Sequence, residues 1–301
     1  MISVGNLSSG GTGKTPTVEM VVRDLVRWGR RPAILSRGYG GRYPRGDNAN
    51  SGAGNDEFHV LAANLPKIPH YQGGDRYASA QKATAAGADV LVLDDGFQHV
   101  RLARDFDLVL VDALSPFDNG SMLPAGLLRE PLEVLERADL FGVTRSDLVS
   151  PEELSTLANY LRRRFPGVPQ VHFHVRPLGW TDLDGNSYPL EALVERKVLA
   201  FCGIGRPESF RLQLTSLGVS VVDTLCFRDH HRYTEGDIQR ILARSCELRV
   251  DEVVMTQKDA VKLAASAATD GWKALRIEQE IVSGLESYRT GLRRACNIQS
   301  S

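Results

Sequence analysis

Short apolar runs alternate along the chain with longer segments whose apolar residues recur at helical spacing. The first half predicts strands at residues 2–6, 32–36, 88–93, 108–111 and 140–144. Helices are predicted at about residues 14–28 and 151–165. In the first of them, one face holds Val18, Val22, Leu25 and Val26. This alternation is typical of βαβ units around a mostly parallel sheet, whose buried strands read as continuous apolar runs.

A change of pattern between residues 167 and 189 separates two halves of the chain. Val171, Phe173 and Val175 alternate with polar residues, as in a half-exposed strand, and Asp-Gly-Asn at 184–186 predicts a hairpin turn. A second series follows, with strands at 198–202, 219–223 and 252–256 and helices at 207–217, 235–243 and from Asp259. We therefore expect an α/β protein with two domains, residues 1–185 and a smaller α/β domain at residues 186–301.

A glycine-rich segment follows the first strand and consists of Ser8, Ser9, Gly10, Gly11, Thr12, Gly13, Lys14 and Thr15. Its glycines let successive N–H groups turn toward phosphate oxygens, and the next helix directs its positive end at the same anion. Lys14 is suited to the β- and γ-phosphates of ATP and the Thr15 hydroxyl to Mg²⁺. Ser8 stands where the G-x-x-x-x-G-K-[ST] pattern has its first glycine, so it must adopt a conformation that suits a residue with a Cβ. The segment predicts an ATP-binding loop and a P-loop NTPase-type sheet, against the alternative of a glycine-rich turn without a ligand.

Two adjacent acids, Asp94 and Asp95, end the buried strand at 88–93. Ligands of open α/β sheets bind at the carboxyl ends of the strands, and a phosphate loop needs a carboxylate there to hold its metal. Adjacent carboxylates repel each other unless a cation or a donor lies between them. We therefore predict that Thr15, Asp94 and Asp95 hold Mg²⁺. The alternative is an aspartate that caps the turn at Gly96.

Three further polar residues each allow two interpretations. Arg37 begins a glycine-rich turn after the strand at 32–36, where it is suited either to neutralise charge on a transferring phosphoryl group or to a surface turn. Asp56 begins a helix, and its spacing alone favours a helix N-terminal charge. Asp112 ends the strand at 108–111 without an acidic companion, so we expect it to cap a turn.

His230 and His231 lie beside Asp229 in the second half. Paired histidines can be metal ligands, but no third ligand at suitable spacing accompanies them, which argues against zinc. A loop pair that is hydrogen-bonded by Asp229 is the alternative.

Composition limits the class of partner. The formal net charge is -1 and the pI about 6.7, so no overall basic field favours nucleic acid. The four cysteines are widely spaced without a C-x-x-C pair, which argues against a disulfide framework and suits a reducing cytoplasm. No apolar run approaches the ~18 residues that a membrane span needs, and no basic-then-apolar leader precedes the first strand.

Taken together, these segments resemble the tetraacyldisaccharide 4'-kinase family, which phosphorylates the lipid A disaccharide precursor in Gram-negative bacteria. The resemblance spans nearly the whole chain in ordered motifs, and it includes the missing first glycine of the phosphate loop. The motifs are residues 4–7, 10–16, 36–40, 54–57, 94–99, 128–131, 229–231 and 256–263. An ordered series of this kind is far more specific than any one motif.

The resemblance implies roles that spacing alone does not show. It implies that Asp56 acts as, or supports, the base for the attacking sugar hydroxyl, assisted by one histidine of the pair His230–His231 in the other domain. Lys14, with Arg37, would stabilise charge on the γ-phosphoryl group. Dividing the base between two domains would let closure assemble it only around bound substrates, which limits wasteful ATP hydrolysis.

The resemblance also implies partners and a location. The lipid A disaccharide precursor carries acyl chains, so the active site is expected to work at a membrane surface, peripherally at the cytoplasmic face of the inner membrane. Family members usually carry an apolar, membrane-associating segment before the first strand, whereas this chain starts at that strand. Two alternatives to the lipid kinase stay open here. One is a kinase or ligase of a soluble metabolite, and the other is a partitioning or metal-delivery ATPase that dimerises across its nucleotide.

Overall fold

The computed structural model describes residues 1–37, 54–263 and 268–298, which form two compact units. The first unit is Met1–Val175 with Gln279–Ser301, and the second is Arg176–Glu278. This division differs from the predicted boundary at residue 185, because the chain enters the second unit at Arg176 and returns to the first at Gln279. Both changes occur inside long strands and not in a linker, so no change of composition marks them.

The first unit is built on a parallel sheet, which confirms the predicted fold class. In spatial order its strands are β7 (Gln170–Asp182), β6 (Leu140–Thr144), β5 (Phe106–Asp112), β1 (Ile2–Asn6), β4 (Val90–Asp94), β2 (Pro32–Ser36) and β3 (His70–Gln72). Each of these strands pairs with its neighbours in parallel. The predicted strands at 2–6, 32–36 and 140–144 have the observed bounds, whereas β3 was not predicted.

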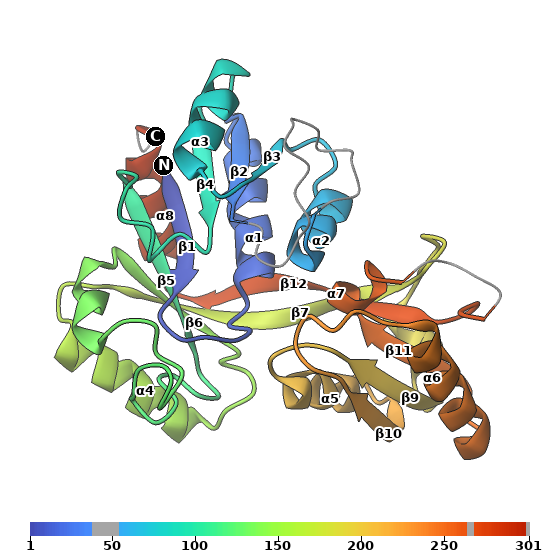
Figure 1. Cartoon of the computed structure of the whole chain (residues 1–301). Coiled ribbons are helices and arrows are strands. Elements are labelled where there is room, and N and C mark those ends of the chain that lie inside the picture. Colours follow the sequence, from blue (N-terminus) through green and yellow to red (C-terminus); the bar gives the residue numbers. More distant parts are fainter. Residues whose placement is uncertain (38–53, 264–267, 299–301) are drawn as a thin grey trace. The chain divides into compact units, whose positions relative to one another are not determined.

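Helices cover both faces of this sheet (Figure 1). On one face, α1 (Lys14–Arg27), α2 (Asp56–Asn64) and α8 (Leu285–Ala295) share an apolar core with β1 and β5. On the other face lie α3 (Arg76–Ala85) and α4 (Pro151–Arg164), with a 3₁₀ turn at Leu132–Arg137.

The predicted apolar face of α1 is buried except at its end. Val18, Val22 and Leu25 are fully buried, and each contributes about 1.5–3 kcal/mol through burial. Val26, which was predicted to share this face, is 46% exposed because it lies at the edge of the stripe in the last turn. This packing fixes α1 against β1, and it therefore fixes both ends of the loop between them.

The strands of the second unit follow the order β10 (Ser220–Cys226), β9 (Lys197–Cys202), β11 (Glu252–Thr256), β12 (Lys273–Ser283) and β7, and β8 (Ser187–Tyr188) pairs with β7 in a hairpin. Helix α5 (Pro207–Ser216) packs on one face and α6 (Glu235–Leu248) on the other. A 3₁₀ turn spans Leu190–Leu193, and the helix predicted from Asp259 is one turn, α7 (Gln257–Ala260).

Among the described residues, no helix combines the length and the apolar character that a membrane crossing requires. In the same ranges, no group of three histidine, cysteine or acidic side chains converges as a metal site.

Candidate active site

The phosphate loop connects β1 to α1 through two glycines in left-handed conformations. The φ angle is 112° at Gly10 and 84° at Gly13, values that a Cβ disfavours. Gly13 is the N-cap of α1, so no N-cap side chain competes for the N–H groups of the first helical turn. Ser8 lies outside the left-handed region, as predicted for a residue with a Cβ, and forms an antiparallel bridge with Leu128. The loop therefore presents free helix-end donors at the carboxyl end of β1.

Lys14 is buried at the base of this loop. Its Nζ donates to Asn6 Oδ1 at 3.1 Å and lies 3.6 Å from Asp95 Oδ1. Asn6 itself is fully buried, and its amide donates to the Ser8 carbonyl at 2.6 Å. The ammonium group is therefore held between the loop and the acidic end of β4, and the expected proximity of Lys14 to the acidic pair is observed.

Asp95 is held by cations on two sides. It has a left-handed backbone, with φ 55°, and its two carboxylate oxygens each lie 2.9 Å from Arg129 Nη1. Burial acts to raise the pKa of Asp95, but Lys14 and Arg129 outweigh it and hold that pKa below its usual value. Arg129 was assigned no role from the sequence. Its place in the motif at 128–131 was the only signal, because its partner lies 34 residues away.

Asp94 has a different environment from its neighbour. Burial, with the nearby charges of Glu57 and Asp95, raises the pKa of Asp94 to about 7. Its Oδ1 is buried and has no hydrogen-bond partner within residues 1–37, 54–263 and 268–298. A buried carboxylate oxygen without a donor fits a site for a cation, which would complete its interactions.

This donor set fits Mg²⁺. Mg²⁺ takes one or two protein carboxylates, the phosphates of its nucleotide and water, and it does not need a cage of three acidic ligands. Asp94 supplies an oxygen that has no partner in the described part of the chain, and Thr15 is the second residue of α1, next to Lys14. Asp95 is already bound by Arg129, so we expect it to act on the metal through the surrounding charge and water.

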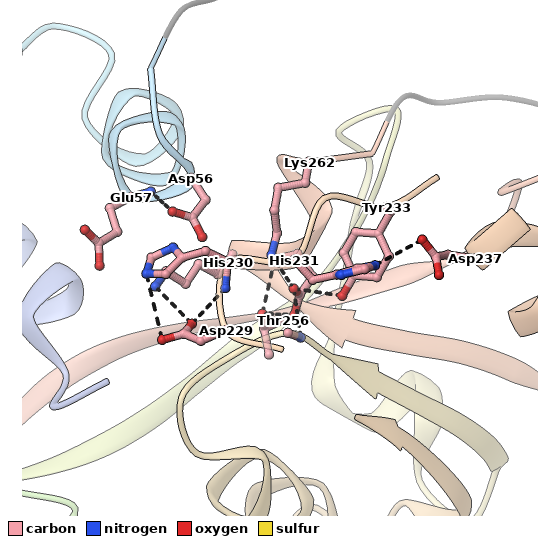
Figure 2. Close-up of polar contacts among 12 residues, drawn as sticks. Asp56, Glu57, Asp229, His230, His231, Tyr233, Asp237, Thr256 and Lys262 are labelled. Carbon is pink, nitrogen blue, oxygen red and sulfur yellow. Dashed lines mark hydrogen bonds and ion pairs between the residues drawn. The ribbon is translucent and has the colours of Figure 1, made fainter. Parts of the chain in front are cut away.

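Asp56 is the first residue of α2 and is 7% exposed. The helix is capped by Asn55, whose Oδ1 accepts from the Phe58 N–H at 2.9 Å, so Asp56 is not needed as the cap. The Asp56 carboxylate accepts from the Glu57 N–H at 3.1 Å (Figure 2). A second amide, Gln72 Nε2, also holds Asn55 at 3.0 Å and ties the start of α2 to β3.

The charges of four arginines act on His99, which lies four residues after Asp95. Burial lowers the pKa of the His99 imidazole, and Arg76, Arg101, Arg104 and Arg37 lower it further by repulsion. Of these, Arg76 also donates to the Asp95 carbonyl at 3.0 Å. The predicted Arg37 therefore belongs to a positively charged region beside the end of β4, which is suited to anions. The rest of its glycine turn, from residue 38, lies outside the described residues.

The histidine pair belongs to the second unit, where the two side chains have different surroundings. The His231 ring stacks on Phe227 at 4.8 Å, and its Nε2 lies 3.0 Å from Asp237 Oδ2 (Figure 2). The Thr234 N–H and the His231 ring together lower the pKa of Asp237 to about 2. The His230 side chain is 51% exposed, and its backbone is left-handed with φ 59°. The backbone N–H of His230 donates to Asp229, as expected for a loop pair beside that acid.

Asp259, from the motif at 256–263, forms several hydrogen bonds to residues in and around this loop. Its side chain is fully buried and accepts from the Gly203 N–H at 3.0 Å, the Tyr233 hydroxyl at 3.0 Å and the Thr256 hydroxyl at 2.7 Å. Lys262 Nζ lies 2.8 Å from the same carboxylate (Figure 2). The carbonyl of Gly203 in turn accepts from the His230 N–H at 3.3 Å. The motif is therefore linked to the histidine loop through Gly203 and Tyr233.

Comparisons with known proteins agree with this geometry. The sequence profile of the family described as tetraacyldisaccharide-1-P 4'-kinase matches residues 1–296. A tetraacyldisaccharide 4'-kinase from Anaeromyxobacter sp. (strain K) is 40% identical, over 97% of this chain and 80% of the relative. Another, from Syntrophus aciditrophicus (strain SB), is 42% identical over 88% of this chain and 75% of the relative.

A solved structure is similar over almost the whole chain. It is the crystal structure of the "apo" form of LpxK from Aquifex aeolicus in complex with ATP. It matches with a TM-score of 0.73 and 31% identity, over 98% of this chain and 87% of that one. On these matches and on the motifs that the fold brings together around Lys14, this chain belongs to the tetraacyldisaccharide 4'-kinase family.

Proposed function

We propose that this chain transfers the γ-phosphoryl group of ATP to the 4'-hydroxyl of a tetraacyldisaccharide 1-phosphate, the lipid A precursor. The observation that carries the proposal is the position of Lys14, which lies between the phosphate loop and the acidic end of β4. Family membership favours this activity over a soluble-metabolite kinase and over a partitioning or metal-delivery ATPase.

The nucleotide half of the site uses backbone donors and a small number of charges. The N–H groups of residues 10–15 bind the phosphates, since the Ser9 N–H already donates to the Leu127 carbonyl, and Lys14 places an ammonium group at the β- and γ-phosphates. Thr15 and Asp94 are the residues that would hold Mg²⁺, and Asp95 would act on it through its charge and through water. When bound, Mg²⁺ neutralises charge on the phosphate oxygens. Positioning and electrostatics are expected to supply most of the rate enhancement, because phosphoryl transfer needs little covalent help from a protein.

The acceptor half of the site has a positive region for an anion. The acceptor named by the family carries a phosphate of its own at position 1. Arg76 donates to the Asp95 carbonyl at 3.0 Å, and the nearby charge of Arg37 lowers the pKa of Arg76, so positive charge gathers beside Asp95. We infer that Arg37 stabilises charge on the γ-phosphoryl group and that the rest of this region receives an anionic group of the acceptor, as arginine does at phosphate sites.

The chemical step needs a base for the sugar hydroxyl. We infer that Asp56 accepts the hydroxyl proton while the sugar oxygen forms its bond to the γ-phosphorus and the bond from that phosphorus to the β,γ-bridging oxygen breaks. ADP leaves with the electron pair of the broken bond. A buried carboxylate that is not needed as the helix cap is suited to this role.

His230 is the better candidate of the two histidines to assist Asp56. His231 is held by Phe227 and Asp237, whereas His230 is the more exposed of the two, at 51% against 29%. We expect His230→Gln to lower kcat by about a hundredfold, as for loss of an assisting acid–base group. His231→Gln should mainly lower stability, by about 1 kcal/mol, because it loses one hydrogen bond to Asp237. Rates and urea unfolding of both variants test the assignment, which is wrong if only His231→Gln loses turnover.

The acyl chains of the acceptor place the reaction at a lipid surface. We infer that the enzyme works peripherally, at the cytoplasmic face of the inner membrane, where an acylated acceptor and cytosolic ATP meet.

The activity is tested by supplying radiolabelled ATP and Mg²⁺ with the tetraacyldisaccharide 1-phosphate in detergent micelles. The expected result is label in the lipid product, in an amount that matches the ADP formed. ATP consumption without labelled lipid would exclude the lipid kinase, and an ATP-dependent doubling of mass would then favour the partitioning type of ATPase.

A further inference from the structure

Two residues at the end of strand β6 bind backbone carbonyl groups of the phosphate loop. Arg145 comes directly after β6, and its Nη2 donates to the Gly11 carbonyl at 2.7 Å. The preceding residue, Thr144, donates its hydroxyl to the Thr12 carbonyl at 3.1 Å. Two successive carbonyl groups of the loop are therefore fixed by neighbouring side chains.

These contacts decide where the loop N–H groups point. In a trans peptide the C=O and the next N–H point in opposite directions within one plane. By holding the Gly11 carbonyl, Arg145 directs the Thr12 N–H to the other side of the loop. By holding the Thr12 carbonyl, Thr144 does the same for the Gly13 N–H. A glycine-rich loop otherwise rotates its peptide units easily, and an inward carbonyl would repel a phosphate.

Arg145 is itself held in an unusual position. Its Nη1 lies 2.5 Å from Asp112 Oδ2, and the Asp112 side chain is 1% exposed while that of Arg145 is 11% exposed. Its backbone is left-handed, with φ 56°, a conformation that costs free energy in a residue with a Cβ. The neighbouring Ser146 fixes the turn, because both its N–H and its hydroxyl donate to the Phe173 carbonyl. Such a conformation persists only where the surroundings determine it.

We propose that Arg145 and Asp112 are positioning residues for ATP: they hold the phosphate loop with its N–H groups turned toward the phosphates. Asp112 binds the guanidinium of Arg145, and Arg145 binds the carbonyl of Gly11. Thr144 binds the next carbonyl, that of Thr12. Asp112 also accepts from the Leu114 N–H at 3.2 Å, so its predicted capping role is present beside this one. The proposal rests on the proposed function only in taking the loop as the ATP site.

The test removes the clamp without leaving a buried charge. The double variant Arg145→Met/Asp112→Leu replaces the ion pair by apolar side chains, a change that proteins often tolerate. Its Kd for MgATP, measured by calorimetry, should rise about tenfold to hundredfold, which corresponds to the loss of one or two charge-assisted hydrogen bonds. Thr144→Val, which loses only the neutral hydroxyl bond, should raise the Kd by about threefold to tenfold.

Arg23→Met is the matched control. Arg23 also pairs with a carboxylate, Glu19 at 2.7 Å, and also donates to a distant backbone carbonyl, that of Asn64 at 3.0 Å. It lies on α1, and its hydrogen bonds go to Glu19 and Asn64, outside residues 8–15. Its loss should lower thermal stability and leave the Kd for MgATP within twofold of the unmodified protein.

Amide hydrogen exchange in the nucleotide-free protein gives a second measurement that does not depend on catalysis. Peptides that cover residues 8–15 should exchange faster in the double variant, while those of β5 and the later turns of α1 keep their protection. A Kd for MgATP within twofold of the unmodified protein, or unchanged exchange of residues 8–15, would overturn the proposal. If the unmodified protein itself fails to bind MgATP, the proposed function fails, and the exchange measurement still decides whether the clamp exists.

Discussion

Replacing Lys14 by alanine should lower turnover by about a thousandfold while the fold is retained, because the γ-phosphoryl group loses a buried positive charge that acts in a water-poor site. The fold should survive since the acid beside Lys14 keeps another partner. Asp95 is bound by Arg129 at 2.9 Å through both oxygens, so this carboxylate is not left without a cation. Initial rates with labelled ATP and a thermal unfolding curve measure the two effects separately.

Lys273 in the second unit offers a matched control for this variant. Its side chain is 10% exposed, against 9% for Lys14, and its Nζ lies 2.8 Å from Glu252. Lys273→Ala therefore removes an equally buried ammonium that also pairs with a carboxylate, far along the chain from the phosphate loop. It should lower stability and change turnover by less than about twofold, since effects of independent sites on the reaction do not couple. Normal turnover in Lys14→Ala would defeat the role assigned to this residue.

The elements that local sequence determines were predicted with nearly their observed bounds. Strand β1, the glycine-rich loop and helix α1 follow one another within 27 residues, and their apolar spacing and glycines are read without knowledge of the rest of the chain. The end of β4 was found in the same way, because four apolar residues before two acids indicate a buried strand with a polar tip.

Features that depend on distant partners were not predicted. Strand β12 carries charged residues at alternate positions and forms part of a sheet only because β11 and β7 lie beside it. The residues of helix α8 were predicted to belong to the second domain, because that domain was expected to span residues 186–301. Helix α8 packs instead on the core of the first unit through Tyr288 and Leu292, which are fully buried. Chain order alone does not reveal such a return.

The candidate site shows the same limit at the level of single residues. Sequence placed Asp94 and Asp95 together as equivalent metal ligands, but their surroundings separate them. Arg129 binds Asp95, whereas Asp94 keeps a buried oxygen without a partner among the described residues. This difference between Asp94 and Asp95 arises from side chains tens of residues away, so it cannot be predicted from spacing or composition.

The second large effect is expected at Asp56, where Asp56→Asn should leave MgATP binding nearly unchanged and lower transfer by about a hundredfold to ten-thousandfold, the usual contribution of a general base. The amide keeps the size of the carboxylate and can still accept from the Glu57 N–H, so α2 should keep its structure. If Asp56 were only a charge at a helix N-terminus, its loss would cost about 0.3–1 kcal/mol of stability and would leave transfer intact. The two interpretations therefore differ in which quantity changes.

The variant Glu57→Gln further separates the two interpretations of Asp56, because Glu57 occupies the next position of the same helical turn and carries the same charge. A helix-charge effect should be similar in both variants, since the dipole acts on any anion in the first turn. A base must instead be one particular carboxylate within reach of the hydroxyl, so the Asp56 variant alone should lose most of its transfer. Rates with saturating MgATP and acceptor, together with the Kd for MgATP, measure this difference. Equal, small losses in both variants would return Asp56 to the role of a helix charge and leave the proton acceptor to be sought elsewhere.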